Sequence, residues 1–263
     1  MERNRTRRIE TIIFENFDEM ARRILEIWRK RSGEALERGG RFSVALSGGS
    51  TPFPFYRLLA EEGRDLPWEH THIFMVDERY VPPGHHDHNC TAIREVLKPL
   101  SLPEENLHAA PTDSLDPLDS AERYEADLRE YFSLPRDGSR SGAFPRFDLM
   151  LLGMGADGHT ASLFPGNFEL EELINWTAIT SPLEDRHQRL TLTFPVLNNA
   201  RDIIFHIVGQ SKDYVAQEVI ERKSALYPAS RVQPPEGTLR YFLDREASSM
   251  LAGSYPAYQA ESS

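Results

Sequence analysis

The segment Phe147–Gly166 reads FDLMLLGMGADGHTASLFPG and joins a short apolar run to three glycines and a histidine. A short apolar run that ends in turn residues is typical of a buried parallel strand. Glycines after such a strand let the chain bend tightly and leave room for a ligand. His159 follows them, and imidazole has the unperturbed pKa best suited to proton transfer near neutral pH.

The same alternation of apolar runs and turns recurs along the chain. Further strands are predicted near Glu10–Phe14 and at Phe42–Leu46, His72–Val76, Phe147–Leu152 and Ile203–Val208. Helical patterns are predicted at 18–36, 52–61, 89–97, 121–132 and 211–222. Because strand and helix alternate, the sequence predicts a doubly wound α/β sheet. In such sheets the ligand lies beyond the carboxyl ends of the strands.

We expect one domain over residues 1–263, with a small lobe inserted around 167–195, where the residues alternate weakly. The stretch 133–146 is rich in Ser, Gly, Pro and Arg and predicts a surface connection. The last ten residues, SYPAYQAESS, predict a loose tail.

Composition and charge exclude several classes of protein. The chain has 41 acidic and 30 basic residues and a net charge of −11, so it repels polyanions and we expect no nucleic-acid partner. The single Cys90 excludes an intrachain disulfide. The charged opening MERNRTRRIE lacks the apolar core of a secretory signal, and no apolar run approaches the roughly 20 residues that span a bilayer. We expect a cytoplasmic monomer that does not bind membranes.

A glycine turn after the strand at Phe42–Leu46 is a candidate phosphate site. It reads SGGSTP and leads directly into a helical pattern. Its glycines allow close approach of the backbone to an anion, and its hydroxyls can donate or cap. The alternative is a plain strand-to-helix turn, since a Walker motif would need Gly-Lys-Ser/Thr. The candidate residues are Gly48, Gly49, Ser50 and Thr51.

Three cations and an aspartate complete the candidate set. Asp77 and Arg79 follow the strand at His72–Val76, where a guanidinium could bind a phosphate or carboxylate. The alternative is a solvated charge run at a sheet edge. Arg189 opens another strand-like run, and Lys212 stands at a predicted helix start, where an anion held close by would favour a cation.

The loop Gly84–Asn89 reads GHHDHN and at first sight resembles a metal cluster. Adjacent positions are poor chelators, and a zinc site usually draws its ligands from two separated pairs. We therefore expect no metal here, and interpret the loop as polar and ending at a helix cap, Asn89.

His159 is the candidate general base. Asp157 could orient its ring, although a residue two positions away could instead cap the turn. A histidine behind a glycine-rich strand end is a better candidate for a base than an isolated histidine.

Together these motifs resemble the 6-phosphogluconolactonases, within the wider group that includes glucosamine-6-phosphate deaminase and ribose-5-phosphate isomerase. The resemblance covers most of the chain and rests on the following segments: LSGGSTP, VDERYVP, LLGMGADGHTASLFPG, RLTLTFPVLNNAR, VGQSK, YPASRV and LDREA.

The resemblance implies a Rossmann-like, doubly wound and mostly parallel sheet with a small appended lobe, and no metal or cofactor. It implies hydrolysis of 6-phospho-D-glucono-1,5-lactone to 6-phospho-D-gluconate in the oxidative pentose phosphate pathway, with a small sugar-phosphate lactone as partner. His159 would be the base, and Asp77, the second candidate catalytic residue, would lie beside the sugar ring. The SGGST loop, Arg79, Asp157, Arg189 and Lys212 would surround the substrate.

His88 stands where family members commonly have serine, which makes it a candidate for substrate contact. Two other functions stay open. A deaminase or isomerase of a sugar phosphate would share the fold, but TASLFPG after His159 is similar to the lactonase form. A sugar-phosphate sensor would usually carry a DNA-binding module, for which the acidic chain leaves no room before its first strand.

Overall fold

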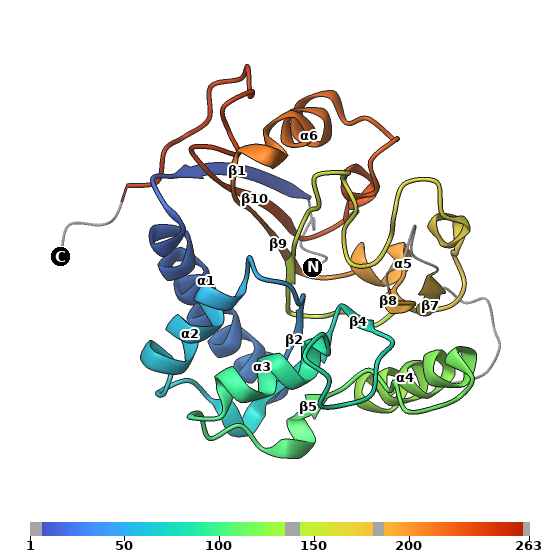
Figure 1. Ribbon diagram of the computed structural model, residues 1–263. Helices are drawn as coiled ribbons and strands as arrows, with labels where there is room; N and C mark the ends of the chain where they lie inside the picture. The colour runs from blue at the N-terminus through green and yellow to red at the C-terminus, as the bar shows by residue number, and fades with distance from the viewer. Residues whose placement is uncertain (1–6, 135–142, 181–186, 260–263) are drawn as a thin grey trace, which may run out of the picture.

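The computed structural model describes residues 7–134, 143–180 and 187–259 (Figure 1). Its seven-stranded parallel sheet has the spatial order β1-β10-β9-β6-β2-β3-β5. In chain order these strands are β1 (Arg8–Phe14), β2 (Phe42–Leu46), β3 (Thr71–Met75), β5 (Leu107–His108), β6 (Leu149–Leu152), β9 (Asp202–Ile207) and β10 (Thr238–Asp244). The predicted doubly wound α/β sheet is confirmed.

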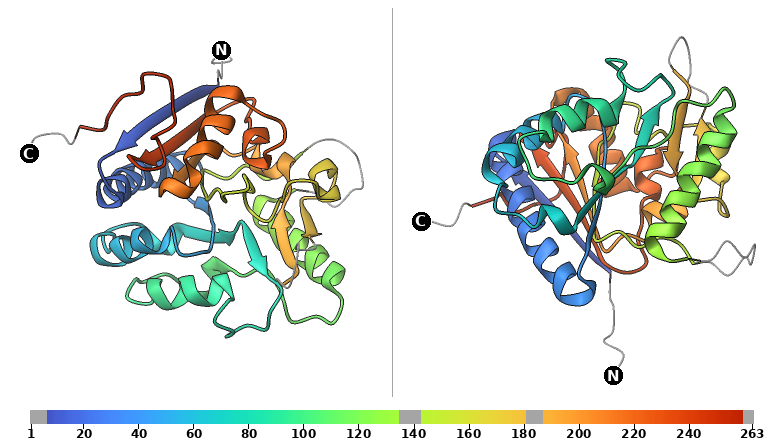
Figure 2. Two further views of the ribbon diagram at one scale, coloured as in Figure 1. Left: turned by 45° about the horizontal axis from the view of Figure 1, so that its top comes forward. Right: turned by 90° about the horizontal axis from the view of Figure 1, so that it is seen from below.

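Helices cover both faces of this sheet (Figures 1 and 2). They are α1 (Phe17–Gly39), α2 (Phe53–Glu62), α3 (Asn89–Leu97), α4 (Pro117–Phe132), α5 (Phe194–Leu197) and α6 (Asp213–Gln217). The first three lie on one face, and α4 and α6 lie on the other, as right-handed crossovers require when the chain reverses its direction across the sheet. No helix in the described residues is long and apolar enough to cross a membrane.

Six short helical turns also occur in the described residues. They are η1 (Trp68–His70), η2 (Glu104–Asn106), η3 (Phe168–Glu171), η4 (Gln210–Lys212), η5 (Glu218–Arg222) and η6 (Pro228–Arg231). The single helix predicted at 211–222 is therefore divided into η4, α6 and the π-helical turn η5, which ends where Lys223 takes a left-handed conformation with φ of 52°.

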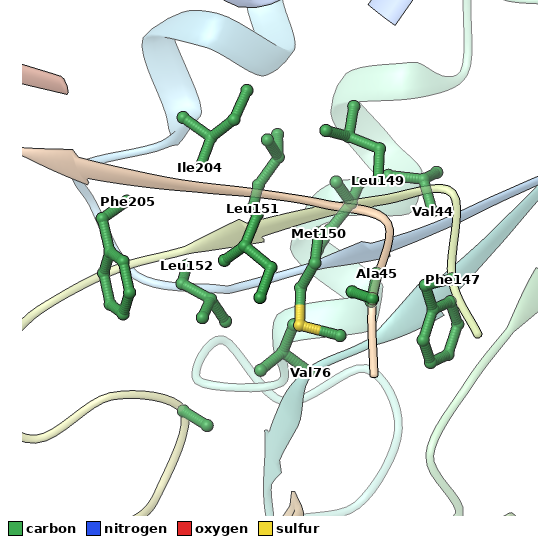
Figure 3. Close-up of a cluster of buried hydrophobic side chains, with 14 of the residues drawn as sticks. Val44, Ala45, Val76, Phe147, Leu149, Met150, Leu151, Leu152, Ile204 and Phe205 are labelled. Atoms are coloured by element: carbon green, nitrogen blue, oxygen red, sulfur yellow. The ribbon is translucent and has the colours of Figure 1, made fainter. Parts of the chain in front are cut away.

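The residues of the central strands are mostly apolar on both faces of the sheet, whereas strands with one exposed face alternate between apolar and polar residues. Leu149 and Leu151 project from one face of β6, and Met150 and Leu152 project from the other (Figure 3). All four are fully buried, because helices cover both faces.

A second, antiparallel sheet has the order β4-β8-β7 and contains β4 (Asp77–Arg79), β7 (Thr177–Thr180) and β8 (Arg189–Leu192). Two of its strands come from the segment 167–195, but the third follows β3 directly. Whether that segment forms a separate lobe stays a prediction. The pairing places Arg79 opposite Arg189.

The end of the chain differs from its prediction. Tyr258 donates its N–H to the carbonyl of Ile13, and the Ile13 N–H donates to Pro256, so the described part of the tail is fastened beside β1. The Tyr258 ring also packs on Phe14, with ring centroids 5.0 Å apart. The predicted surface connection at 133–146 falls largely on residues 135–142, outside the described residues.

Candidate active site

The candidate site lies where the sheet order reverses. From β2 the chain continues outward to β3, whereas from β6 it continues the opposite way to β9, although β2 and β6 are neighbours. Loops that leave adjacent strands in opposite directions leave a crevice between them at the carboxyl edge. The loops at this crevice are the two glycine-rich segments singled out in the sequence, 47–52 and 153–166.

The loop after β2 is held by buried hydrogen bonds. Ser47 Oγ donates to the Leu151 carbonyl at 2.9 Å, and Tyr56 Oη donates to the Ser47 carbonyl at 2.6 Å. Gly48 must be glycine, because a Cβ there would lie 1.9 Å from Asn89 Oδ1. Gly49 has a φ of 88°, which also favours glycine.

Helix α2 starts directly behind this loop without a side-chain cap. Its N-cap residue is Pro52, and the predicted capping role of Ser50 and Thr51 is wrong. The first N–H groups of a helix have no partner within the helix and carry partial positive charge. The end of α2 at the crevice is therefore suited to an anion.

The glycine-rich loop after β6 brings His159 and Asp157 together. His159 Nδ1 lies 2.5 Å from Asp157 Oδ1, and the His159 backbone N–H donates to the same oxygen at 3.1 Å. Burial alone would raise the pKa of Asp157, but these hydrogen bonds outweigh it and hold the pKa below its ordinary value. The carboxylate is thus ionised and accepts only, so Nδ1 carries a proton, and in the neutral form of the ring Nε2 is the nitrogen with the free lone pair.

Two glycines make this pair possible. A Cβ on Gly155 would lie 2.2 Å from His159 Nδ1. Gly158 has a φ of 77°, and a Cβ there would lie 2.4 Å from the ring of Tyr227. Gly155 therefore leaves the space that the His159 ring fills, and Gly158 lets the chain turn beside Tyr227.

The second sheet contributes charge beside this loop. Asp77 is buried, and its Oδ2 accepts from Ser162 Oγ at 2.6 Å and lies 3.8 Å from Arg189 Nη1. The ring of Phe164 lies near both His159 and Arg189. Its centroid is 4.7 Å from the centroid of the His159 ring and 5.8 Å from the Arg189 guanidinium. The structure thus brings Asp77, His159 and Arg189 into one connected group.

Glu78 has a different role from its neighbours. Its carboxylate is fully buried and accepts the backbone N–H groups of Arg79, Asn89 and Cys90 at 2.7–2.8 Å. Burial raises the pKa of Glu78 to about 7, although these bonds oppose the shift. Glu78 therefore fastens the start of α3 to β4.

Lys212 lies at the start of α6 in a partly buried position. Burial lowers its pKa, while Asp244 opposes that shift. His206 is buried nearby, and burial together with the Lys212 charge lowers the pKa of its ring to about 3. His206 Nε2 has no partner among the described residues and lies 4.0 Å from where a Cβ on Gly153 would stand. This lysine therefore stands near the start of the glycine-rich loop.

Both ring nitrogens of His88 have protein partners. It is buried, its Nδ1 accepts from the Thr91 N–H at 3.2 Å, and its Nε2 lies 3.2 Å from Thr112 Oγ1. The helix cap predicted at Asn89 is wrong by one residue, because His88 is the N-cap of α3. Asn89 instead donates through Nδ2 to the Asp77 carbonyl at 3.0 Å and packs on Gly48.

Sequence reasoning missed three contributors: Ser162, Phe164 and the joining role of Asn89. Ser162 and Phe164 stand inside the quoted segment Phe147–Gly166, but no spacing rule connects them to β4 and β8. Their partners become visible only once the second sheet is placed against the loop.

The fold and the site together define an α/β protein that presents a histidine–aspartate pair, arginines and an uncapped helix end at one crevice. The chain belongs to the family described as glucosamine-6-phosphate isomerases/6-phosphogluconolactonase, whose model matches residues 15–241. The resemblance stated from the motifs is confirmed.

Relatives on the lactonase side of this family cover most of the chain. A 6-phosphogluconolactonase of Synechocystis sp. is 41% identical over 224 residues, which is 84% of this chain and 89% of the relative. A probable chloroplastic 6-phosphogluconolactonase of rice is 35% identical over 92% of this chain and 76% of its own length. The solved 6-phosphogluconolactonase of Thermotoga maritima is 33% identical with a TM-score of 0.74, over 91% of this chain and all of the other.

The fold alone is shared more widely. A solved monomeric glucosamine-6-phosphate deaminase is 17% identical, with a TM-score of 0.73 over 92% of this chain and 99% of its own.

Proposed function

We propose that this protein hydrolyses 6-phospho-D-glucono-1,5-lactone to 6-phospho-D-gluconate, the lactone-opening step of the oxidative pentose phosphate pathway, with His159 as the general base. The enzyme class, a 6-phosphogluconolactonase and thus a lactone hydrolase, follows from the family and its relatives. The observation that supports the proposed mechanism is the contact between His159 Nδ1 and Asp157 Oδ1 at 2.5 Å.

That contact gives the neutral His159 ring the tautomer that a base needs. With Nδ1–H held by the carboxylate, Nε2 can take a proton from a water molecule as its oxygen attacks the lactone carbonyl carbon. The tetrahedral oxyanion then collapses, the bond from that carbon to the ring oxygen breaks, and the imidazolium returns the proton to the ring oxygen. The product is the open-chain acid, and His159 is neutral again.

The charged groups of the crevice fit the phosphate of this substrate. Arg79 and Arg189 stand opposite each other on β4 and β8. The uncapped end of α2 offers backbone N–H groups, and Lys212 adds a cation. A dianionic phosphate can bind such a group of donors even though the whole protein is acidic.

Asp77 has the role of a positioning residue in this proposal. Its Oδ2 already accepts from Ser162 Oγ and faces Arg189 Nη1. It therefore fixes both the glycine-rich loop and an arginine, and its second oxygen is the one that could accept from a sugar hydroxyl.

The test is hydrolysis of freshly generated lactone, corrected for spontaneous opening, by the wild type, His159→Ala and the control His70→Ala, which changes an exposed histidine outside the site. We expect His159→Ala to lower kcat by about 10² or more and His70→Ala to leave it unchanged. Equal rates for wild type and His159→Ala would remove His159 from the chemistry. Release of ammonia from glucosamine 6-phosphate without lactone hydrolysis would favour the deaminase instead.

A further inference from the structure

A second group of histidines lies outside the proposed mechanism. His85, His86 and Asp87 belong to the loop between β4 and α3, and His187 comes from a separate segment just before β8. We call these four residues the histidine cluster. Sequence reasoning did not connect His187 with the loop, because about 100 residues separate it from Asp87.

The cluster is centred on one carboxylate oxygen, Asp87 Oδ2. It lies 3.1 Å from His187 Nε2, 3.4 Å from His86 Nε2 and 3.9 Å from His85 Nδ1. Potential ligand atoms of the three loop residues all lie within 4.8 Å of one another, and this is the one such group in the described residues.

These separations suit a small divalent ion. Four ligands around a tetrahedral zinc ion, each about 2.1 Å from the metal, stand about 3.4 Å from one another. Imidazole nitrogens and a carboxylate oxygen are ligands that zinc and its neighbours in the first transition row accept. We propose that the histidine cluster is a binding site for a divalent transition-metal ion of the zinc type. This replaces the expectation of no metal, which rested on the loop residues alone.

The site can be reached from solvent and needs only small movements. His86 is 82% exposed and His187 is 43% exposed, so both rings can turn toward a shared ion. His85 Nδ1 now accepts from the Asp87 N–H at 3.1 Å, so His85 binds by giving up that bond or through its other nitrogen. The cluster therefore has a core of three ligands, His85, His86 and Asp87, and His187 is the fourth, brought in by its contact with Asp87 Oδ2.

A metal here would join two segments that carry site arginines. The Asp87 carbonyl accepts from Arg79 Nη1 at 2.9 Å. The Tyr80 N–H donates to the Gln188 carbonyl at 2.7 Å, between His187 and Arg189. An ion shared by the loop and the start of β8 would thus restrict the backbone on both sides of the Arg79–Arg189 pair.

The test is a zinc titration of the full chain after chelator treatment, followed by calorimetry and by competition with a chromophoric chelator. We expect one zinc ion per chain, and a loss of affinity of about tenfold or more in His86→Ala, Asp87→Asn and His187→Ala. His70→Ala, which removes an exposed histidine outside the cluster, should bind zinc as the wild type does. All these side chains are partly or fully exposed, so the variants should fold.

Cobalt gives an independent readout of the same site. Co²⁺ bound by nitrogen and oxygen ligands in a tetrahedral site has visible absorption that His187→Ala should abolish or shift. Zinc binding that is absent, or that is equally strong in His86→Ala, His187→Ala and His70→Ala, would overturn the proposal. Neither readout depends on lactone hydrolysis, so the metal site and the proposed function fail or succeed separately.

Discussion

At the scale of single residues, the contacts of His159 with Asp157 and the space left by Gly155 determine the position of the His159 ring. Asp157 Oδ1 holds the ring and the backbone of the same residue, and Gly155 leaves the space that the ring fills. Sequence reasoning found this pair because both residues stand in one glycine-rich turn. It could not decide whether Asp157 orients the ring or caps the turn; the contacts show that its carboxylate binds both groups.

The crowding at Gly155 gives a sharp test of this geometry. In Gly155→Ala the new methyl would lie 2.2 Å from His159 Nδ1 and 2.5 Å from Asp157 Oδ1, so the ring must move off the carboxylate. We expect kcat for lactone hydrolysis to fall by about 10². The matched control is Gly153→Ala in the same loop, whose nearest side-chain atom is 4.0 Å away. Similar losses in both variants would show that the loop, not the ring position, limits the rate.

At the scale of elements, the sequence predicted the central strands well and the last strand not at all. The run at 42–46 matches β2, and the helix at 89–97 matches α3. Strand β10 was missed because Arg240 interrupts its apolar residues. An arginine in a sequence indicates an exposed position unless its buried partners are known. Those partners are Glu10 on β1 and Asp202 on β9.

Asp202 is the centre of a buried ion network that ties α1 to the sheet. It is fully buried and binds Arg31 Nε at 2.6 Å and also Arg240 Nη1. Burial raises the pKa of Asp202 even though both arginines oppose the shift. The network therefore holds a carboxylate in an environment that is costly for charge unless both partners remain.

Removing that carboxylate should be severe. We expect Asp202→Ala to lower the free energy of unfolding by about 3–5 kcal/mol, because it leaves two arginines without their shared partner. Asp65→Ala breaks an exposed pair with Arg29 and should leave the urea midpoint almost unchanged. Since Asp202 starts β9, at the end opposite to the site, lactone hydrolysis by the folded fraction should be normal. Equal midpoints for the two variants would contradict a structural role for the network.

Over the whole molecule, the sequence predicted the features that depend on residues close together in the chain. It did not predict the contacts between segments that are far apart in the chain. Strand composition and glycine turns are local, so the doubly wound sheet and its crevice could be predicted. The second sheet is not local, since it pairs residues 77–79 with 189–192 and 177–180. For this reason the joining of Asp77 with Arg189 and of His187 with Asp87 appeared only in three dimensions.

Buried ionisable groups spread over the molecule also make its stability depend on pH. Burial lowers the pKa of His72 and of His88 to about 4 and helps lower that of His206 to about 3. In the unfolded chain each ring has a pKa of about 6.5. Glu78 works in the opposite direction, because burial raises its pKa to about 7 from an unfolded value of about 4.3.

Between about pH 6.5 and 4.5 the three histidines are therefore protonated in the unfolded chain and neutral in the folded protein. Over the same range Glu78 is protonated in the folded protein and ionised in the unfolded chain. The net is about two protons, so the free energy of unfolding should fall as the pH drops, approaching about 3 kcal/mol per pH unit. Urea unfolding at half-unit steps from pH 7 to 4.5 measures this slope. His206→Leu should reduce it by about one proton, or about 1.4 kcal/mol per pH unit. A slope unchanged in His206→Leu would mean that His206 takes up its proton inside the folded protein, beside Lys212, and that this part of the crevice is open to water.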